Sequence, residues 1–275
     1  MKIKIATLVE DTAGGRGILA EHGLCFRIEA GPRKLLFDTG QGHVLTGNAR
    51  RLGIPLEQTG AVIISHGHYD HTGGLLETLR LTGKKRVYAH PIALKPKYAK
   101  NADGSAREIG ISSLDEQKIR AQAELIFTEK PVEIGDGVFL TGPVPRQNDF
   151  EDTGGQFFAD PDCLHPDALV DDQSAFIETP SGTVVILGCA HAGVINTLNY
   201  IRELTGNRPI HTVLGGMHLL AAGPARIDKT LREFRSLGVK RLIPCHCTGM
   251  AAMAKMWHEF PDKCFACPTG TVLEF

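Results

Sequence analysis

The chain has 275 residues, of which 42% are hydrophobic and 22% charged, as in ordinary soluble globular proteins, and this length can bury a substantial core. A formal net charge of −1 gives no general attraction to nucleic acid or to an anionic membrane, so we expect neither as a partner. The first residues lack a secretory signal, and no run of about 18 apolar residues occurs, which predicts a cytoplasmic protein without a membrane-spanning helix.

Strands and helices are expected in the first eighty residues at well-defined places. In order, we expect a strand over 2–9, a hairpin over 24–29 and 34–38, a helix over 44–53, a strand over 61–65 and a helix from the glycines at 73–74 to about residue 81. The loop 10–17 is rich in glycine but lacks the Gly-Lys-Ser/Thr ending of a phosphate-binding P-loop.

Four residues of metal-binding type follow the predicted strand at 61–65. They are His66, His68, Asp70 and His71, all within six positions. Side chains two apart leave an extended segment on the same side, so His66 and His68 can converge on one ion. Glycines nearby allow sharp turns, so Asp70 and His71 can reach a second ion. A mere polar turn after a core strand would not account for this cluster, and the spacing predicts two metal ions.

The stretch 66–71 resembles the HxHxDH signature of the metallo-β-lactamase superfamily, and Asp38-Thr39-Gly40 resembles the strand end that precedes it. The resemblance implies the α/β (α+β) class, with a four-layer αββα sandwich and a metal site at one edge. We expect a single domain over 1–275. The implied cofactors are two divalent metal ions, with zinc preferred and iron, manganese or magnesium as alternatives.

The remaining elements surround a less regular segment at 92–128, which we interpret as an insertion that forms a lid over the site. Its lysines at 95, 97 and 100 are expected mostly on the surface. Outside it we expect strands over 86–91, 138–146, 171–178, 183–187, 211–219 and 241–249, and helices over 194–204, 225–237 and 251–260.

The later metal ligands of the superfamily are histidines that follow strands, and here the chain departs from the usual pattern. Many members carry the third histidine near the strand 138–146, but no histidine lies between residues 91 and 164. His191 follows the strand 183–187 and is assigned as the third histidine, and His246 fits the final one. The resemblance therefore implies a ligand set of His66, His68, Asp70, His71, His191 and His246.

Candidates for substrate binding are Arg16, Arg146 and His90. The loop that holds Arg16 often overhangs the metal site in the superfamily, although an ordinary exposed arginine is an equal alternative. Arg146 lies where a ligand is usually found, and its planar guanidinium suits phosphate or carboxylate. His90 ends a predicted strand and has either a structural or a substrate-contacting role.

The catalytic residues that the resemblance suggests are Asp70 and His218. Asp70 would bind metal and orient the attacking water, and His218 would donate a proton.

Seven cysteines without a secretory signal predict reduced thiols. Cys189 lies two positions before His191 and could supply a thiolate ligand, although a small buried cysteine is the commoner case. Cys245, Cys247, Cys264 and Cys267 could together bind a structural zinc ion or an iron–sulfur cluster, an alternative that conflicts with the assignment of His246.

Three motifs narrow the resemblance, and they are Gly-Cys-x-His-x-Gly at 188–193, Gly-Gly-x-His-Leu at 215–219 and Pro-Cys-His-Cys-Thr-Gly at 244–249. They are similar to those of the subfamily of 7,8-dihydropterin-6-methyl-4-(β-D-ribofuranosyl)aminobenzene 5′-phosphate synthase-like proteins. The implied reaction couples a pterin-methyl diphosphate to an arylamine and releases diphosphate. The expected partner is thus a small phosphorylated molecule.

Alternative functions from other classes remain open. The first alternative is a binuclear metal hydrolase of a small phosphate ester, phosphodiester or lactone. The second is an iron-dependent redox enzyme, although the chain has no room for the flavodoxin domain of flavodiiron proteins. A non-catalytic metal-binding module is the third. The oligomeric state does not follow from the sequence.

Overall fold

The computed structural model describes residues 2–275, with Ser113 described by its backbone alone. The chain divides into two compact units, each assembled from separated stretches of sequence. Unit 1 comprises the chain as far as Glu129, together with Gln156–Asp171 and Pro268–Phe275. Unit 2 comprises Lys130–Gly155 and Asp172–Cys267. The expectation of a single domain over 1–275 stays a prediction.

Unit 1 is built on a seven-stranded sheet with the order β16-β1-β2-β3-β4-β5-β8. Its strands are β1 (Ile3–Val9), β2 (Cys25–Ala30), β3 (Arg33–Phe37), β4 (Ala61–Ile63), β5 (Lys85–Ala89), β8 (Ala123–Phe127) and β16 (Val272–Glu274). The strands from β3 to β8 run parallel, so their carboxyl ends share one edge of the sheet. The chain leaves β4 at this edge and enters the histidine-rich stretch at 66–71.

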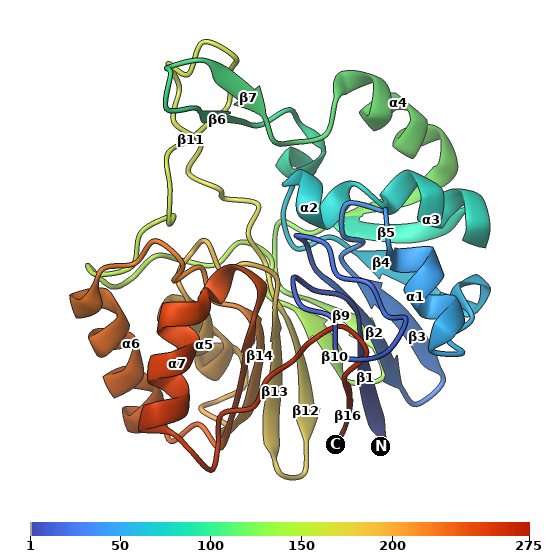
Figure 1. The fold of residues 1–275 in the computed structure, drawn as a ribbon. Coiled ribbons are helices and arrows are strands. Elements are labelled where there is room, and N and C mark those ends of the chain that lie inside the picture. Colours follow the sequence, from blue (N-terminus) through green and yellow to red (C-terminus); the bar gives the residue numbers. More distant parts are fainter. Residues whose placement is uncertain (1) are drawn as a thin grey trace. The chain divides into compact units, whose positions relative to one another are not determined.

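Helices cover the sheet of unit 1 and bury apolar side chains against it (Figure 1). They are α1 (Leu45–Arg51), α2 (Tyr69–Thr72), α3 (Leu75–Thr82) and α4 (Ser113–Gln122), with single turns η1 (Leu56–Gln58) and η2 (Pro91–Leu94). Leu75 and Leu79 are one helical turn apart in α3 and pack in one cluster with Val62 of β4. This packing fixes α3 next to the strand that leads to the candidate ligands.

Residues 92–128 contain more regular structure than expected. β8 lies at the edge of the main sheet of unit 1, and Ser112 caps the start of α4, because its hydroxyl accepts a hydrogen bond from the Asp115 N–H. β6 (Tyr98–Lys100) and β7 (Ala106–Glu108) form a small sheet with β11 (Phe157–Phe158). The segment therefore contributes to the body of unit 1, while its action as a lid stays a prediction.

Unit 2 contains a six-stranded sheet with the order β15-β14-β13-β12-β10-β9. Its strands are β9 (Val132–Gly135), β10 (Val138–Leu140), β12 (Ala175–Thr179), β13 (Gly182–Leu187), β14 (Ile210–Gly216) and β15 (Arg241–Cys245). β13, β14 and β15 run parallel, so the chain leaves all three strands at the same edge. His191, His218 and His246 follow these three strands in turn.

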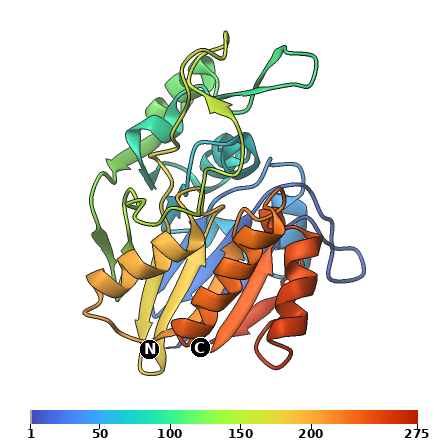
Figure 2. The same ribbon diagram turned by 90° about the vertical axis from the view of Figure 1, so that its left-hand side faces the viewer.

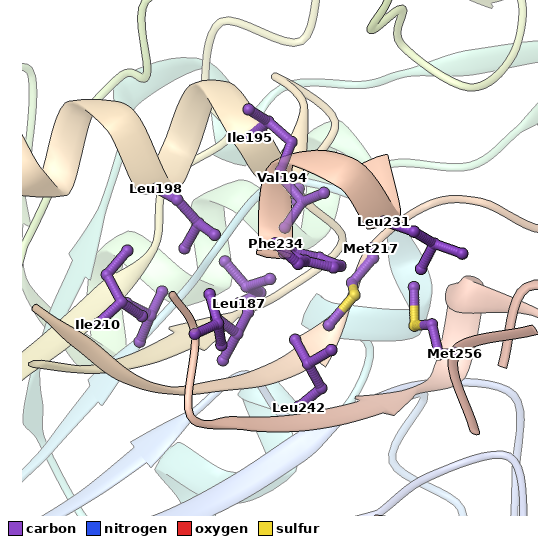
Figure 3. Packing of buried hydrophobic residues seen from close by; sticks show 14 of the residues in the cluster. Leu187, Val194, Ile195, Leu198, Ile210, Met217, Leu231, Phe234, Leu242 and Met256 are labelled. Atoms are coloured by element: carbon purple, nitrogen blue, oxygen red, sulfur yellow. The ribbon is translucent and has the colours of Figure 1, made fainter. Parts of the chain in front are cut away.

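Three helices lie on one face of the sheet of unit 2, and they are seen side by side in Figure 2. They are α5 (Val194–Leu204), α6 (Pro224–Ser236) and α7 (Met250–Glu259), with a single turn η3 (His246–Thr248). Leu187, Leu198 and Phe234 belong to the apolar cluster between sheet and helices (Figure 3). No helix described within residues 2–275 combines the length and the hydrophobicity of a membrane span.

Candidate functional site

The exit of β4 brings two histidine rings of unit 1 close together. His66 Nε2 lies 3.1 Å from His68 Nδ1, and the ring centroids are 4.6 Å apart. His66 is completely buried and His68 nearly so. The Ser65 hydroxyl lies 3.0 Å from His66 Nδ1 and occupies that side of the ring. The Nε2 atom of His66 and the Nδ1 atom of His68 therefore face each other, as the spacing of two residues predicted.

Asp70 and His71 form a second pair in the short helix α2. His71 Nε2 lies 3.7 Å from Asp70 Oδ2, and the His71 ring is 4.2 Å from that of His66. Asp70 Oδ2 also lies 3.2 Å from Nε2 of His22, whose Nδ1 is 2.9 Å from an oxygen of Asp11. His22 thus contacts a predicted ligand, a relation that sequence spacing alone did not reveal.

Asp38 orients His71 from the opposite side of its ring. Its Oδ2 lies 2.7 Å from His71 Nδ1, and both side chains are fully buried. The Ser65 backbone N–H and hydroxyl both donate to the same carboxylate, at 2.7 Å each. Because Nδ1 then carries the hydrogen, Nε2 of His71 is left as the nitrogen with a lone pair.

Buried charged side chains hold the turn between His66 and His68 in place. The Gly67 N–H donates to Asp171 Oδ2 at 2.8 Å, and Lys97 Nζ lies 3.1 Å from Asp171 Oδ1 and 2.6 Å from Asp167 Oδ2. Lys97 is only 1% exposed and is the exception among the three lysines expected mostly on the surface, since Lys95 and Lys100 are exposed. A Cβ at Gly67 would lie 2.5 Å from the Ala93 carbonyl oxygen, so only glycine fits there.

In unit 2, the turns after the parallel strands carry strained backbone as well as histidines. Ala190, His218 and His246 have positive φ angles of 52°, 46° and 50°. Such conformations cost non-glycine residues about 1–3 kcal/mol and tend to occur at functional sites. The residues with strained backbone therefore lie at the same edge of the sheet of unit 2 as His191, His218 and His246.

His191 is completely buried and held by several contacts within unit 2. Its Nδ1 lies 2.8 Å from the Thr153 carbonyl oxygen, which leaves Nε2 as the nitrogen with a lone pair. The neighbouring Ala192 N–H donates to Asp172 at 2.9 Å, and Arg146 donates to the His191 carbonyl oxygen at 2.8 Å. The His218 ring lies 4.1 Å from the His191 ring.

Two cysteines lie beside these histidines. Sγ of Cys189, a ring nitrogen of His218 and Sγ of Cys247 all lie within 4.8 Å of one another. Burial by itself would raise the pKa of the Cys247 thiol, but a hydrogen bond with Cys189 and the nearby charge of His218 lower it overall. Burial pushes the pKa of His218 down, yet its interaction with Cys247 raises it.

Residues 19–246 match the family model described as the metallo-beta-lactamase superfamily. The chain belongs to the metallo-beta-lactamase superfamily. This membership confirms the resemblance that the stretch 66–71 carries.

Relatives of this superfamily member span nearly its whole length. A 7,8-dihydropterin-6-methyl-4-(β-D-ribofuranosyl)-aminobenzene-5′-phosphate synthase of Methanocaldococcus jannaschii is 28% identical, over 99% of this chain and 97% of its own. An uncharacterized protein of the same organism is 32% identical, over 92% of this chain and 93% of its own. A crystal structure described as a metal-dependent hydrolase of the beta-lactamase superfamily is 36% identical, with a TM-score of 0.86 and 99% of both chains covered. The expected α/β (α+β) metallo-β-lactamase fold is confirmed.

The donor groups of this metallo-beta-lactamase superfamily member fit a metal ion on chemical grounds. Two nitrogens bound to one zinc ion at about 2.0–2.1 Å lie slightly more than 3 Å apart, close to the 3.1 Å between His66 Nε2 and His68 Nδ1. Hydrogen bonds of His71 and His191 through Nδ1 leave the Nε2 lone pairs to bind metal. Metal dependence of the kind common in the superfamily is thus compatible with both units.

The predicted substrate-binding residues lie in different surroundings. Arg16 is exposed in the loop after β1, and Arg146 is exposed and donates a hydrogen bond to the His191 carbonyl oxygen. His90 is buried at the end of β5, where its Nδ1 accepts a hydrogen bond from the Ile92 N–H at 3.3 Å. Burial lowers the pKa of His90. Their substrate roles stay predictions.

The alternative cluster of four cysteines finds no support. Among the residues that the structure describes, the converging groups of ligand-type atoms include Cys189 and Cys247 but not Cys245, Cys264 or Cys267. Cys264 belongs to the apolar cluster of unit 2, and burial raises its pKa to about 12. Cys264 therefore packs in the core of unit 2 and takes no part in the converging groups of ligand-type atoms among the described residues.

The tripeptide Asp-Thr-Gly, also known from aspartic proteases, occurs at 38–40 and again at 152–154. The first places Asp38 against His71, and the second places the Thr153 carbonyl against His191. The Asp38 side chain is fully buried, whereas that of Asp152 is 75% exposed and paired with Arg226. Both tripeptides therefore orient a histidine, which is not the role they have in a protease.

Proposed function

We propose that this chain is a metal-dependent transferase that joins a dihydropterin-methyl group to the amine of ribofuranosylaminobenzene phosphate and releases diphosphate. The observation that carries this proposal is the 28% identity, over 99% of the chain, with a synthase named for that product. The expected partner is thus a small phosphorylated molecule, and we expect the reaction to take place in the cytoplasm.

The proposed ligands of two divalent metal ions, with zinc preferred, are His66, His68, Asp70, His71, His191 and His246. Their support is the superfamily membership together with the donor geometry found separately in each unit. Bound divalent ions would neutralise the charge that develops on the leaving diphosphate.

The reaction exchanges one bond for another without any redox step. The amine nitrogen forms a bond to the methyl carbon of the pterin, the carbon–oxygen bond to diphosphate breaks, and the amine loses a proton. We assign His218 to donate a proton to a leaving oxygen, because its ring lies 4.1 Å from that of His191. Asp70 would keep its place through His22, 3.2 Å away.

Several side chains of the protein would bind the substrate in this reaction. The guanidinium groups of Arg16 and Arg146 suit phosphate oxygens, and Arg146 is already positioned by the His191 carbonyl. In unit 1, the Phe157 ring lies 5.0 Å from that of His68 and would offer an aromatic face to a planar pterin. His90 would contact substrate as a neutral imidazole, in keeping with its lowered pKa.

A metal-dependent hydrolase of a small phosphate ester, phosphodiester or lactone is the second candidate function. It is favoured by the structure described as a metal-dependent hydrolase, which is 36% identical to this chain with a TM-score of 0.86. In that case a water molecule would attack in place of the amine.

The deciding experiment incubates metal-loaded protein with the dihydropterin-methyl diphosphate, with and without the arylamine phosphate. A transferase releases diphosphate only when the arylamine is present, in equal amount with the joined product seen by mass spectrometry. Release of phosphate or diphosphate without arylamine, with ¹⁸O from labelled water in the released phosphate, would establish the hydrolase instead. No release in either case would refute both functions for this substrate.

Matched variants connect the measured activity to the assigned residues. His66→Ala should abolish activity, whereas His165→Ala should retain it, because His165 is a highly exposed histidine of unit 1. Chelation should abolish the activity of the unmodified protein, and addition of zinc should restore it.

A further inference from the structure

Cys189 stands out among the buried thiols of unit 2 by the chemistry of its neighbours. It follows Gly188 at the end of β13 and is 3% exposed. Its Sγ lies within 4.8 Å of a ring nitrogen of His191 and also within 4.8 Å of a ring nitrogen of His246. A single sulfur is thus near two histidines that belong to different turns.

Imidazole neighbours distinguish the surroundings of the Cys189 sulfur from those of a core thiol. A buried thiol that acts as a small hydrophobe is expected in contact with aliphatic side chains, and Cys264 meets this expectation because it belongs to the apolar cluster of unit 2. Cys189 is not a member of that cluster, although its neighbour Ala190 is. The Cys189 sulfur is therefore placed among imidazoles while the adjacent residue packs in the core.

The backbone holds the sulfur in this place at an energetic cost. Ala190, between Cys189 and His191, has a φ of 52°, and His246 has a φ of 50°. The turn is fixed further by the Ala192 N–H, which donates to buried Asp172 at 2.9 Å. Strain at both turns is understandable if it directs the sulfur and the two imidazoles toward shared metal ions.

We propose that Cys189 is a thiolate ligand shared between the ion that His191 binds and the ion that His246 binds. The proposal rests on the metal dependence of the proposed function and adds an anionic sulfur to its ligands. The thiol proton is released to solvent as the metal–sulfur bond forms. A soft thiolate favours zinc, iron or cobalt over magnesium, so the proposal also restricts the choice of metal.

The distances agree with this role. Zinc binds sulfur at about 2.3 Å and nitrogen at about 2.0–2.1 Å, so sulfur and nitrogen on one tetrahedral ion lie roughly 3.6 Å apart. The Cys189 sulfur lies within 4.8 Å of a ring nitrogen of His191 and of one of His246, so each pair has to approach by at most about 1.2 Å to share an ion. Cys247 is the competing thiol, since its sulfur is also within 4.8 Å of that of Cys189.

X-ray absorption of the zinc-loaded, unmodified protein tests the proposal without any substitution. A shared thiolate predicts a sulfur shell near 2.3 Å with on average about one sulfur per zinc. Half this amount would mean that the sulfur binds a single ion, and its absence would mean that Cys189 is no ligand. Either of these results overturns the shared-ligand proposal.

Cobalt spectra of variants assign the sulfur to a residue. The thiolate-to-cobalt absorption band should vanish in Cys189→Ser and Cys189→Asp but persist in Cys247→Ser and in the core control Cys264→Ser. Cys189→Asp should still bind two equivalents of cobalt, because a carboxylate replaces the anionic ligand. A band that persists in both Cys189 variants, or that disappears in Cys247→Ser, would refute the assignment.

These measurements separate the two proposals. If the unmodified protein binds no metal, the proposed function fails together with the ligand assignment. If it binds two equivalents without a sulfur signal, only the role of Cys189 fails, and the transferase assay stands independently.

Discussion

Asp38 and His71 form a completely buried carboxylate–imidazole pair, with 2.7 Å between Oδ2 and Nδ1. The pair joins the turn after β3 to the helix α2 and fixes which nitrogen of His71 presents its lone pair. A change at Asp38 should therefore act on metal affinity more than on the fold.

We expect Asp38→Asn to weaken metal binding by about 10–100-fold, as is typical for the loss of such an orienting carboxylate. Competition with a chelator measures this affinity, and circular dichroism checks that the fold is retained. Asp262→Asn, at an exposed position of unit 2, is the matched control and should bind metal as the unmodified protein does. Equal affinities of the two variants would contradict the orienting role.

Lys97→Met should destabilise the protein by about 3–5 kcal/mol, because it leaves the buried carboxylates of Asp167 and Asp171 without their cation. Urea unfolding measures the loss. The control is Lys95→Met, since Lys95 forms a partly exposed pair with Glu116 and its loss should cost at most about 1 kcal/mol. A similar small effect in both variants would show that the buried pair contributes little.

Gly67→Ala and Gly47→Ala should have opposite effects on stability. At Gly67 the added Cβ would meet the Ala93 carbonyl oxygen at 2.5 Å, so the turn between His66 and His68 must shift and metal affinity must fall. Gly47 lies within α1, and a Cβ there meets nothing within 4 Å, so alanine should stabilise by about 0.5–1 kcal/mol. Thermal unfolding with and without zinc tests both, and a neutral Gly67→Ala would refute the close approach.

His90 should make the folded state sensitive to mild acid. Burial lowers its pKa below the usual 6.5, so the unfolded chain takes up the proton first and the free energy of unfolding falls as the pH drops through about 6.5. The loss should level off once the pH is below the pKa in the folded state. His90→Gln should reduce the slope of unfolding free energy against pH in this range, and an unchanged slope would exclude His90 as its source.

The sequence pattern was sufficient to predict the helices and strands in which apolar residues recur at a regular spacing. The helices predicted over 225–237 and 251–260 are found as α6 and α7. The strands predicted before His191 and His246 are found as β13 and β15. α4 was missed because few of its residues are apolar, and its start depends on the Ser112 cap. β16 was missed because it has three residues and depends on β1 for its pairing.

The local geometry of the site could be predicted where the relevant residues are close in sequence, while the assignment of metal ligands stays a prediction. The rings of His66 and His68 face each other because the two residues are two positions apart in the chain. Asp171 supports the same turn from 104 positions away, and no local pattern announces such a partner. For the same reason Lys97 could not be distinguished from a surface lysine, because its burial depends on Asp167 and Asp171.

Strand β16 pairs with β1, with Leu273 opposite Ile5, so the sheet of unit 1 gains its last strand from residues beyond unit 2. The ribosome therefore synthesises every residue of unit 2 before it synthesises this strand. Until then β1 is an open sheet edge that could pair with another nascent chain. Protein synthesis thus sets an order of maturation, in which the unit that presents His191 and His246 can fold first and the unit that presents His66 and His68 is completed last.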